Sequence, residues 1–340
     1  MRFYFLMIAI LVVSGCATAS PESNYAKTYA SAYAKGFEDG FNKAADIKMP
    51  EKQAAVTPQY NQYGYPYYDN YYDNYGAVGT AKKGTLSYSV QTGDMKSVKE
   101  IVEGKKAGVN DLDQSGYSPL QIASRMGFID IMEYLISKGA NINFASSDGY
   151  TPLKEAITYK KFSAADILIA KGADTNYIDS AGYSMLYYSC ASGNKKLVET
   201  ILAKGASPNV VASNGYGPLI ASVSMGFEDI AVLLLEKGAN PDETDNYSGF
   251  TALMYAVRNN KPKLVELLAP KSKNINFSEK TGKTALHFAV EYNRLDMVKV
   301  LVNSGASVDV KDSSGNTPVD TANQRNLKDI VDFFKSTKKI

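Results

Sequence analysis

Histidine and cysteine, the side chains that most often bind metals or act as nucleophile and base, are nearly absent from this chain. Its 340 residues include one histidine, His287, and two cysteines, Cys16 and Cys190. A zinc site needs several such side chains at close spacing, and the sequence has neither an HExxH nor a CxxC motif. GxSxG, P-loop and GxGxxG motifs are also missing. We therefore predict that the protein is not an enzyme, with no catalytic residue, metal, cofactor or small-molecule substrate.

The charge balance argues against a polyanionic partner. The chain has 37 Lys and Arg against 35 Asp and Glu, a net charge of +2, and only five of the 37 are Arg. A surface this close to neutral gives little long-range attraction, and arginine is the residue best suited to bidentate phosphate contacts. We expect no nucleic acid partner.

A repeat of 33 residues organises the last three quarters of the sequence. A glycine opens segments such as "GYSPL", "GYTPL" and "GKTAL", and a second segment such as "LISKGANIN" follows about twenty residues later. The intervals between these glycines are 33, 33, 33, 34, 33 and 33 residues. The glycines are Gly116, Gly149, Gly182, Gly215, Gly249, Gly282 and Gly315. A fixed period of this length indicates stacked structural units.

Each unit predicts two short helices. In the first one, Pro119 suits the first turn of a helix, Gly127 ends it, and Gly139 ends a second helix as a left-handed cap. The apolar stripes of the two helices are Leu120 and Ala123, then Ile131, Leu135 and Ile136. One such pair cannot bury its own apolar face, so neighbouring pairs must stack.

This pattern of G-x-T-P-L-x-x-A and L-L-x-x-G-A-x-x-N at 33-residue spacing resembles the ankyrin repeat. The resemblance implies an all-α solenoid of stacked helix-turn-helix units with short β-turn fingers, over residues 84–340. We predict an N-terminal cap at 84–115, repeats at 116–314 and a C-terminal cap at 315–340. Two departures leave the local geometry of 242–276 open: a one-residue insertion in the finger "ETDNYSGF", and Lys271 and Ser272 in place of Gly-Ala.

The ankyrin resemblance also gives His287 a role. Histidine often follows T-P-L in that family, where it ties the turn of one repeat to the backbone of the next. The aligned residues of the other units share no evident chemistry, so we predict that His287 is part of the scaffold. Cys190 stands where the family usually has alanine, and we expect it to be a small buried side chain with an unreactive thiol.

In ankyrin repeats, fingers and first helices line the concave side, and solenoids bind partners on such surfaces. The residue after the finger glycine is aromatic in five consecutive units, which we call the aromatic row: Tyr117, Tyr150, Tyr183, Tyr216 and Phe250. Aromatic side chains dominate protein interfaces. A second interpretation is that repeat duplication copied a tyrosine that packs on its neighbouring finger. Further partner-binding residues are expected at the ends of the first helices: Arg125, Met126, Tyr159, Met225, Arg258 and Tyr292.

The N-terminus predicts export. Arg2 precedes an apolar run, Phe3 to Val13, that is short for a membrane-spanning helix, so residues 1–15 are typical of a signal peptide. "VVSGC" resembles the lipobox of bacterial lipoproteins, which implies that Cys16 becomes the acylated first residue of the mature chain. An ordinary secretory peptide is the alternative. With Ala17 rather than Asp after the cysteine, the resemblance implies the outer membrane, and we expect the protein to face the periplasm.

Two segments separate this anchor from the repeats. The stem, residues 16–48, has aromatics every four residues from 25 to 41 and is either a membrane-lying or partner-bound helix or a loosely ordered stretch. Residues 49–83 form a Tyr-rich linker in which residues 57–78, "TPQYNQYGYPYYDNYYDNYGAV", have eight tyrosines and almost no aliphatic residues and are predicted to be disordered. It is either a plain tether or a segment that stacks on glycan or protein.

Together these features predict a monomeric, non-catalytic scaffold for protein–protein interaction, with a membrane lipid anchor and a protein partner. An alternative within the same class is an immunity lipoprotein that neutralises a toxic enzyme delivered to the periplasm. An envelope hydrolase or a host-directed effector would need features that the sequence does not offer: a catalytic cleft, or release from the membrane.

Overall fold

The structure is a computed structural model that describes residues 81–337. Over these residues the chain forms sixteen α-helices and one 3₁₀ turn, with no extended β-strand. The predicted all-α solenoid is confirmed. The predicted signal peptide and stem lie outside the described residues, as does most of the predicted linker.

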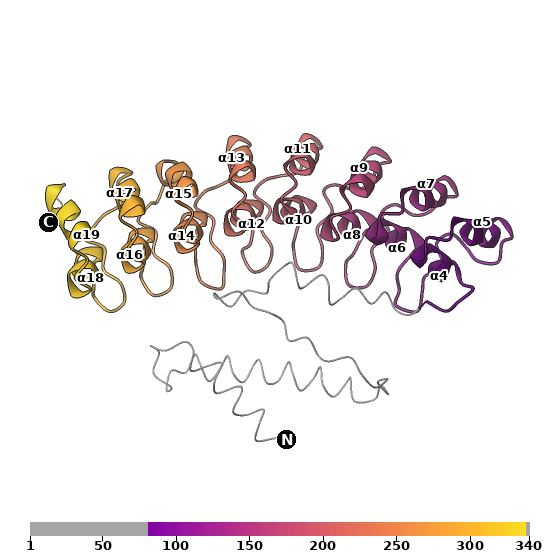
Figure 1. Ribbon diagram of the computed structural model, residues 1–340, viewed down its shortest axis with the longest axis horizontal. Helices are drawn as coiled ribbons and strands as arrows, with labels where there is room; N and C mark the ends of the chain where they lie inside the picture. The colour runs from indigo at the N-terminus through magenta and orange to yellow at the C-terminus, as the bar shows by residue number, and fades with distance from the viewer. Residues whose placement is uncertain (1–80, 338–340) are drawn as a thin grey trace, which may run out of the picture. The chain divides into compact units, whose positions relative to one another are not determined.

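The helices stand in two parallel rows, with the loops of the fingers projecting beyond one of them (Figure 1). The row next to the fingers consists of α4 (Leu86–Gln91), α6 (Pro119–Met126), α8 (Pro152–Thr158), α10 (Met185–Ser192), α12 (Pro218–Met225), α14 (Ala252–Arg258), α16 (Ala285–Glu291) and α18 (Pro318–Gln324). The other row consists of α5 (Met95–Glu103), α7 (Ile129–Ser137), α9 (Phe162–Ala170), α11 (Lys195–Ala203), α13 (Glu228–Glu236), α15 (Pro262–Leu268), α17 (Leu295–Asn303) and α19 (Lys328–Ser336). We call the first row the inner helices and the second the outer helices.

Local sequence explains where the inner helices begin and end. The hydroxyl of Ser118 accepts a hydrogen bond from the Gln121 N–H, and Pro119 takes the first helical position, where its missing N–H costs nothing. Gly127 then stops α6 in the left-handed conformation, with φ of 75°. The predicted boundaries of this helix are confirmed.

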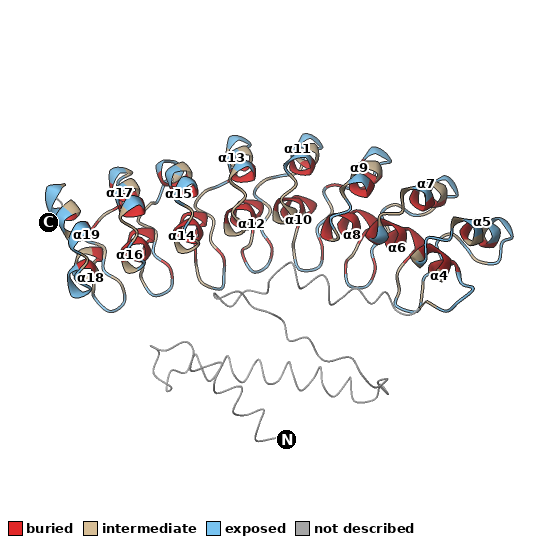
Figure 2. Cartoon of the chain, in the orientation of Figure 1, coloured by how far each residue is buried: buried red, intermediate tan, exposed pale blue. Residues whose placement is uncertain are grey.

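The core runs between the two rows through every unit. The residue four positions after each finger glycine is nearly inaccessible in six units, and the buried sides of both rows face each other (Figure 2). These residues are Leu120, Leu153, Leu186, Leu219, Leu253 and Leu286. Each inner helix packs against the outer helix of its own unit and against the inner helices of neighbouring units, so apolar area is buried between units.

The fingers are tight turns closed by the backbone. In the first, the Gly116 N–H donates to the Asp113 carbonyl, and the Asp113 N–H donates to the Tyr117 carbonyl. The Asp113 carboxylate accepts from the N–H groups of Ser115 and Tyr117. Gly116 has φ of 82°, a conformation that residues with a side chain seldom adopt. This arrangement sets where the chain enters each inner helix.

The two irregularities found in the sequence are absorbed locally. In the finger with the insertion, the Gly249 N–H donates to the carbonyl of Asp245, four residues back rather than three, and the Asp245 carboxylate accepts from the N–H groups of Tyr247, Ser248 and Phe250. Where Gly-Ala is missing, a 3₁₀ turn, Ala269–Lys271, extends α15. The stack therefore continues through 242–276.

Among the helices of residues 81–337, none combines the length and hydrophobicity required to span a bilayer.

Candidate functional site

The aromatic row lies where each finger joins its inner helix. Its four tyrosines are half-buried and Phe250 is 7% exposed. None of the five rings stands apart: each contacts another ring, a cation or a hydrogen-bonding side chain of the described units. We call the surface formed by the fingers and the inner helices the inner face.

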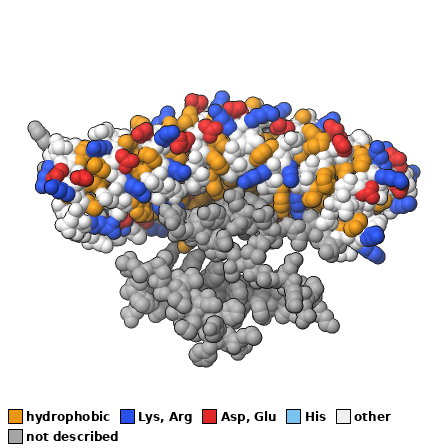
Figure 3. All heavy atoms as spheres, in the orientation of Figure 1, with side chains coloured by type: hydrophobic (Ala, Val, Ile, Leu, Met, Phe, Trp, Pro, Cys, Tyr) orange, Lys and Arg blue, Asp and Glu red, His pale blue; other side chains and the backbone are white. Residues whose placement is uncertain are grey.

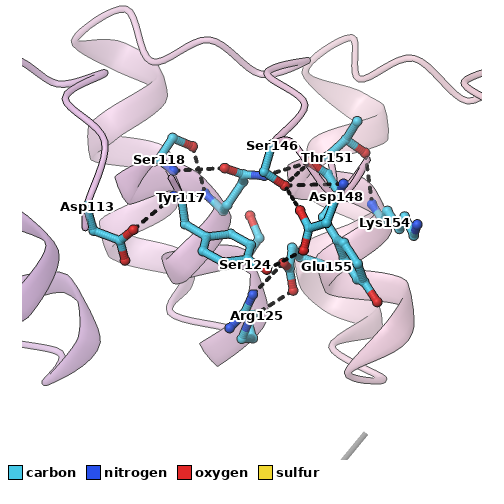
Figure 4. A network of polar contacts seen from close by, with 12 residues as sticks. Asp113, Tyr117, Ser118, Ser124, Arg125, Ser146, Asp148, Thr151, Lys154 and Glu155 are labelled. Atoms are coloured by element: carbon cyan, nitrogen blue, oxygen red, sulfur yellow. Dashed lines mark hydrogen bonds and ion pairs between the residues drawn. The ribbon is translucent and has the colours of Figure 1, made fainter. Parts of the chain in front are cut away.

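A buried ion pair joins the first two full units (Figure 4). Arg125 at the end of α6 donates to both carboxylate oxygens of Glu155 on α8, from Nε at 2.9 Å and from Nη2 at 2.6 Å. The two side chains are 6% and 0% exposed. Burial raises the pKa of Glu155, and the bonds from Arg125 oppose that rise. The pair is costly to desolvate, so both partners must be present.

Two tyrosines cover this ion pair. The guanidinium carbon of Arg125 lies 4.5 Å from the ring centre of Tyr117 and 5.2 Å from that of Tyr159. The Tyr117 hydroxyl donates to the Asp148 carboxylate in the next finger at 2.6 Å. Burial, followed by this hydrogen bond, raises the pKa of Tyr117 to about 12. The structure thus brings together three predicted residues: Tyr117, Arg125 and Tyr159.

A second buried ion pair follows one unit later. Lys154 Nζ lies 2.7 Å from Asp179 Oδ2, and the Tyr188 hydroxyl donates to the same oxygen. The ring centres of Tyr150 and Tyr188 lie 4.1 Å and 4.8 Å from Lys154 Nζ. Burial alone would raise the pKa of Asp179, but the bonds from Lys154 and Tyr188 hold it below its ordinary value. The aromatic row is here again in contact with a cation.

Aromatic contacts take the place of buried ion pairs in the two units that follow. Tyr183 packs 4.3 Å from Tyr187, centre to centre, and its hydroxyl accepts from the Asn214 amide. The hydroxyls of Tyr216 and Tyr255 lie 2.5 Å apart.

The next two units contribute a cluster of aromatic rings around an arginine. Phe250 packs against Tyr255 and Phe288, with ring centres 5.5 Å and 5.0 Å away. The Arg258 guanidinium lies 5.0 Å from the Phe250 ring centre, and Tyr292 stacks on Phe288. The structure therefore brings the predicted residues Phe250 and Arg258 into contact and links Tyr292 to them through Phe288.

The remaining predicted residues lie at the ends of inner helices. Met126 ends α6 and is 37% exposed, and Met225 ends α12 and is half-buried. Arg125, in contrast, is inside the structure, where it serves the ion pair rather than the surface.

Sequence reasoning missed several residues of these clusters. Four of them stand six positions after a finger glycine: Glu155, Tyr188, Tyr255 and Phe288. The signal was available, because this position is aromatic in three of the seven units and faces the aromatic row.

His287 is scaffold, as predicted. Its Nδ1 accepts from the Thr284 N–H, so Nε2 carries the proton and donates to the Asn316 carbonyl of the next unit at 3.2 Å. Burial lowers the pKa of this ring, which stays neutral. The expectation that the aligned residues share no chemistry was wrong for Gln121, whose Oε1 accepts from the Ser118 N–H and whose Nε2 donates to the Tyr150 carbonyl.

Cys190 and the possible metal ligands form no reactive site in the part of the chain that the structure describes. Cys190 is fully buried in α10, and burial raises the pKa of its thiol. Within residues 81–337 no three or more His, Cys, Asp or Glu side chains are grouped so as to hold a metal ion.

Comparison with known proteins agrees with this geometry. The family model for ankyrin repeats in three copies matches residues 86–179, 159–245, 186–279, 220–312 and 253–339, which together span three quarters of the chain. The chain belongs to the ankyrin repeat family. Members of this family act as protein–protein interaction scaffolds, and this chain has the same architecture.

Among solved structures, the chain is similar to the ankyrin repeat domain of Bcl-3, described as a unique member of the IkappaB protein family. The two are 28% identical with a TM-score of 0.55, and the match covers 64% of this chain and 100% of that one. No curated protein matches the sequence.

Exposed apolar side chains gather on one side of the ankyrin stack. Of seven large hydrophobic residues that are markedly exposed in the described part of the chain, six lie on fingers or at the ends of inner helices, and one, Val232, lies on an outer helix. The six are Leu112, Met126, Ile178, Val211, Tyr247 and Tyr292. The outer helices instead present Lys, Asp and Glu among their apolar side chains (Figure 3). The exposed apolar side chains of the described residues therefore concentrate on the inner face.

Proposed function

We propose that this ankyrin-repeat protein is a non-catalytic scaffold that binds a partner protein through its inner face. A lipid on Cys16 holds it in the bacterial outer membrane, facing the periplasm. The main support for this binding surface is the concentration of exposed apolar side chains on fingers and inner-helix ends. Burying them against a partner removes apolar area from water, which favours association.

The organisation of the inner face supports the same role. The rings of the aromatic row already contact buried cations or neighbouring rings, and the Tyr117 hydroxyl donates to Asp148. A side chain that is ordered before binding loses little conformational entropy when a partner docks. Rigid aromatic side chains therefore suit an interface, and they need no catalytic group.

The test places a photo-crosslinking amino acid at matched positions of the full chain in living cells. Met126 and Val232 are both 37% exposed, the first on an inner helix and the second on an outer helix. We expect a discrete protein adduct from position 126 and from Ile178 on a finger, and none from position 232. Equal adducts from both faces, or adducts from position 232 alone, would contradict the proposal.

The anchor has a separate test. Cys16→Ser removes the thiol that the lipid would occupy, so the protein should lose the incorporation of a clickable palmitate analogue and move from the membrane to the soluble fraction. Cys190→Ser is the control: because Cys190 is buried, labelling should not change. Membrane retention of the Cys16→Ser variant would contradict the lipid anchor.

The identity of the adduct at position 126 separates two versions of this function. A resident envelope protein supports an adaptor, whereas a toxic enzyme supports the immunity alternative.

A further inference from the structure

We propose that the partner protein docks on the first five fingers through a basic segment, in which lysine or arginine is interleaved with apolar side chains. This inference rests on the proposed function, because it names the chemistry of the partner that the same inner face binds. The five fingers are residues 107–116, 140–149, 173–182, 206–215 and 239–249.

Charge is segregated on these fingers. They carry no lysine or arginine, although the whole chain has a net charge of +2, and they carry eight carboxylates: Asp111, Asp113, Asp148, Asp174, Asp179, Asp242, Glu243 and Asp245. Asp179 and Asp245 are buried, and the other six are exposed or half-buried. None of these six has an ion-pair partner among residues 81–337. Their combined field attracts cations and repels anions.

A stripe of apolar side chains crosses the same fingers. The residue four positions before the finger glycine is apolar and exposed in the first four of them: Leu112, Ala145, Ile178 and Val211. The fifth finger presents Tyr247, which is 61% exposed. In the sixth and seventh fingers the position of Leu112 is taken by Ser278 and Lys311, and further lysines follow the same change: Lys271, Lys273 and Lys280. The stripe therefore ends where finger cations begin, so one partner must suit both apolar side chains and carboxylates.

Hydrogen bonds between neighbouring fingers make this surface continuous. At each of the four junctions a backbone N–H donates to the preceding finger: Asn141 to the Asn110 side chain, Asp174 to the Asn143 side chain, Ser213 to the Ala181 carbonyl and Asn246 to the Asn214 carbonyl. Three extended residues span about 10 Å, which is about the distance between stacked helices. One extended segment can therefore place a cation and an apolar side chain against each finger in turn.

Glu243 is the finger carboxylate with most to gain from a cation. A Cβ added at Gly217 would lie 3.0 Å from Val211 Cγ1 and 3.1 Å from Glu243 Oε2, so this carboxylate lies close to an apolar side chain of the stripe. Burial raises the pKa of Glu243 to about 7, and no hydrogen bond or ion pair within the described residues opposes that rise. A nearby opposite charge stabilises the ionised carboxylate, and a lysine or arginine of the partner would supply it.

A labelled peptide of five Lys-Leu-Ser repeats, one for each finger, tests the assignment by fluorescence anisotropy with the purified Cys16→Ser chain. The matched peptides are Glu-Leu-Ser and Lys-Ser-Ser repeats of the same length. We expect Lys-Leu-Ser to bind most tightly, and its affinity to fall as salt rises from about 0.1 M to about 1 M, which shortens the Debye length from about 10 Å to about 3 Å. A Glu-Leu-Ser or Lys-Ser-Ser peptide that binds as tightly would overturn the proposal.

Two variants with equal changes in net charge locate the bound peptide. The finger variant combines Asp111→Asn, Asp174→Asn and Glu243→Gln. The control variant removes three exposed carboxylates of outer helices: Glu133→Gln, Glu236→Gln and Asp332→Asn. The finger variant should bind the Lys-Leu-Ser peptide about tenfold more weakly than the parent, and the control variant should match the parent. Equal affinities of the two variants would overturn the proposal.

The peptide test and the crosslinking test fail separately. Protein adducts from positions 126 and 178, together with a peptide that shows no preference for the first five fingers, would overturn the basic segment and leave the proposed function standing. A selective peptide without such adducts in cells would contradict the proposed function instead.

Discussion

Two regions of the stack use the same repeat positions in different ways. In the early region, Arg125 reaches forward thirty residues to Glu155, beneath the ring of Tyr117. In the later region Arg258 stands at the position of Arg125, with Phe250 in place of Tyr117 and Phe288 in place of Glu155. A buried ion pair is thus replaced by a cluster of aromatic rings around the arginine.

The difference teaches that the repeat fixes positions rather than chemistry. In both regions the backbone places the residues one and nine after a finger glycine close to the residue six after the next finger glycine, and either set of side chains fills the space. The same holds for Gln121 and His287, which make the same two hydrogen bonds to their own turn and to the next unit. Substitutions that put the side chains of one region at the matching positions of the other therefore test whether these positions are equivalent.

The largest effect is expected at the ion pair. Glu155→Ala leaves the buried Arg125 without its carboxylate and should lower the free energy of unfolding in urea by about 3–5 kcal/mol. The double variant Arg125→Met with Glu155→Leu removes both charges, so no buried charge is left unpaired, and it should lose much less. A double variant as unstable as Glu155→Ala would contradict the role assigned to the ion pair.

Gln121 and His287 occupy the same repeat position in two different units, and a smaller effect is expected there. His287→Ala removes the contacts to Thr284 and Asn316 and should cost about 1–3 kcal/mol. His287→Gln introduces the side chain that already makes these contacts in the early region, so its stability should be close to that of the parent.

The same histidine gives a pH signature. Because the pKa of His287 is lower in the folded than in the unfolded protein, the unfolded state binds more protons as the pH falls below about 6.5. Stability should therefore decrease on acidification below that pH, and His287→Gln should remove that part of the decrease. The measurement is the free energy of unfolding as a function of pH for the parent and for His287→Gln. Identical profiles would contradict a buried, neutral His287 ring.

The smallest effect is expected at the aromatic row. Tyr117→Phe gives the early region the side chain that Phe250 supplies later, and it removes the hydroxyl that donates to Asp148 while keeping the ring. We expect a loss of about 0.5–1.5 kcal/mol, measured by urea unfolding, with the contact to Arg125 kept. A loss of unfolding free energy as large as that of Glu155→Ala would mean that the hydroxyl of Tyr117, rather than its ring, holds this side chain against the ion pair.

Much of the fold could be predicted because its cause is local. The glycine period, Pro119 at a helix start and Gly127 at a helix end each act through nearby backbone, and the structure places them as expected. His287 could be interpreted through its family resemblance. The partners of the candidate site could not be predicted in the same way, because Arg125 and Glu155, or Phe250 and Phe288, meet only when one unit packs on the next.

The sequence by itself determined the architecture, the number of stacked units and the lack of catalytic motifs, since periodic apolar positions and helix-capping residues act over a few residues. Only the tertiary structure decided which side chains are buried and which remain at the surface. Arg125 and Met126 are neighbours in the chain, yet one is enclosed by an ion pair and two rings and the other is exposed. That outcome depends on side chains thirty residues away, which stacking alone brings into contact.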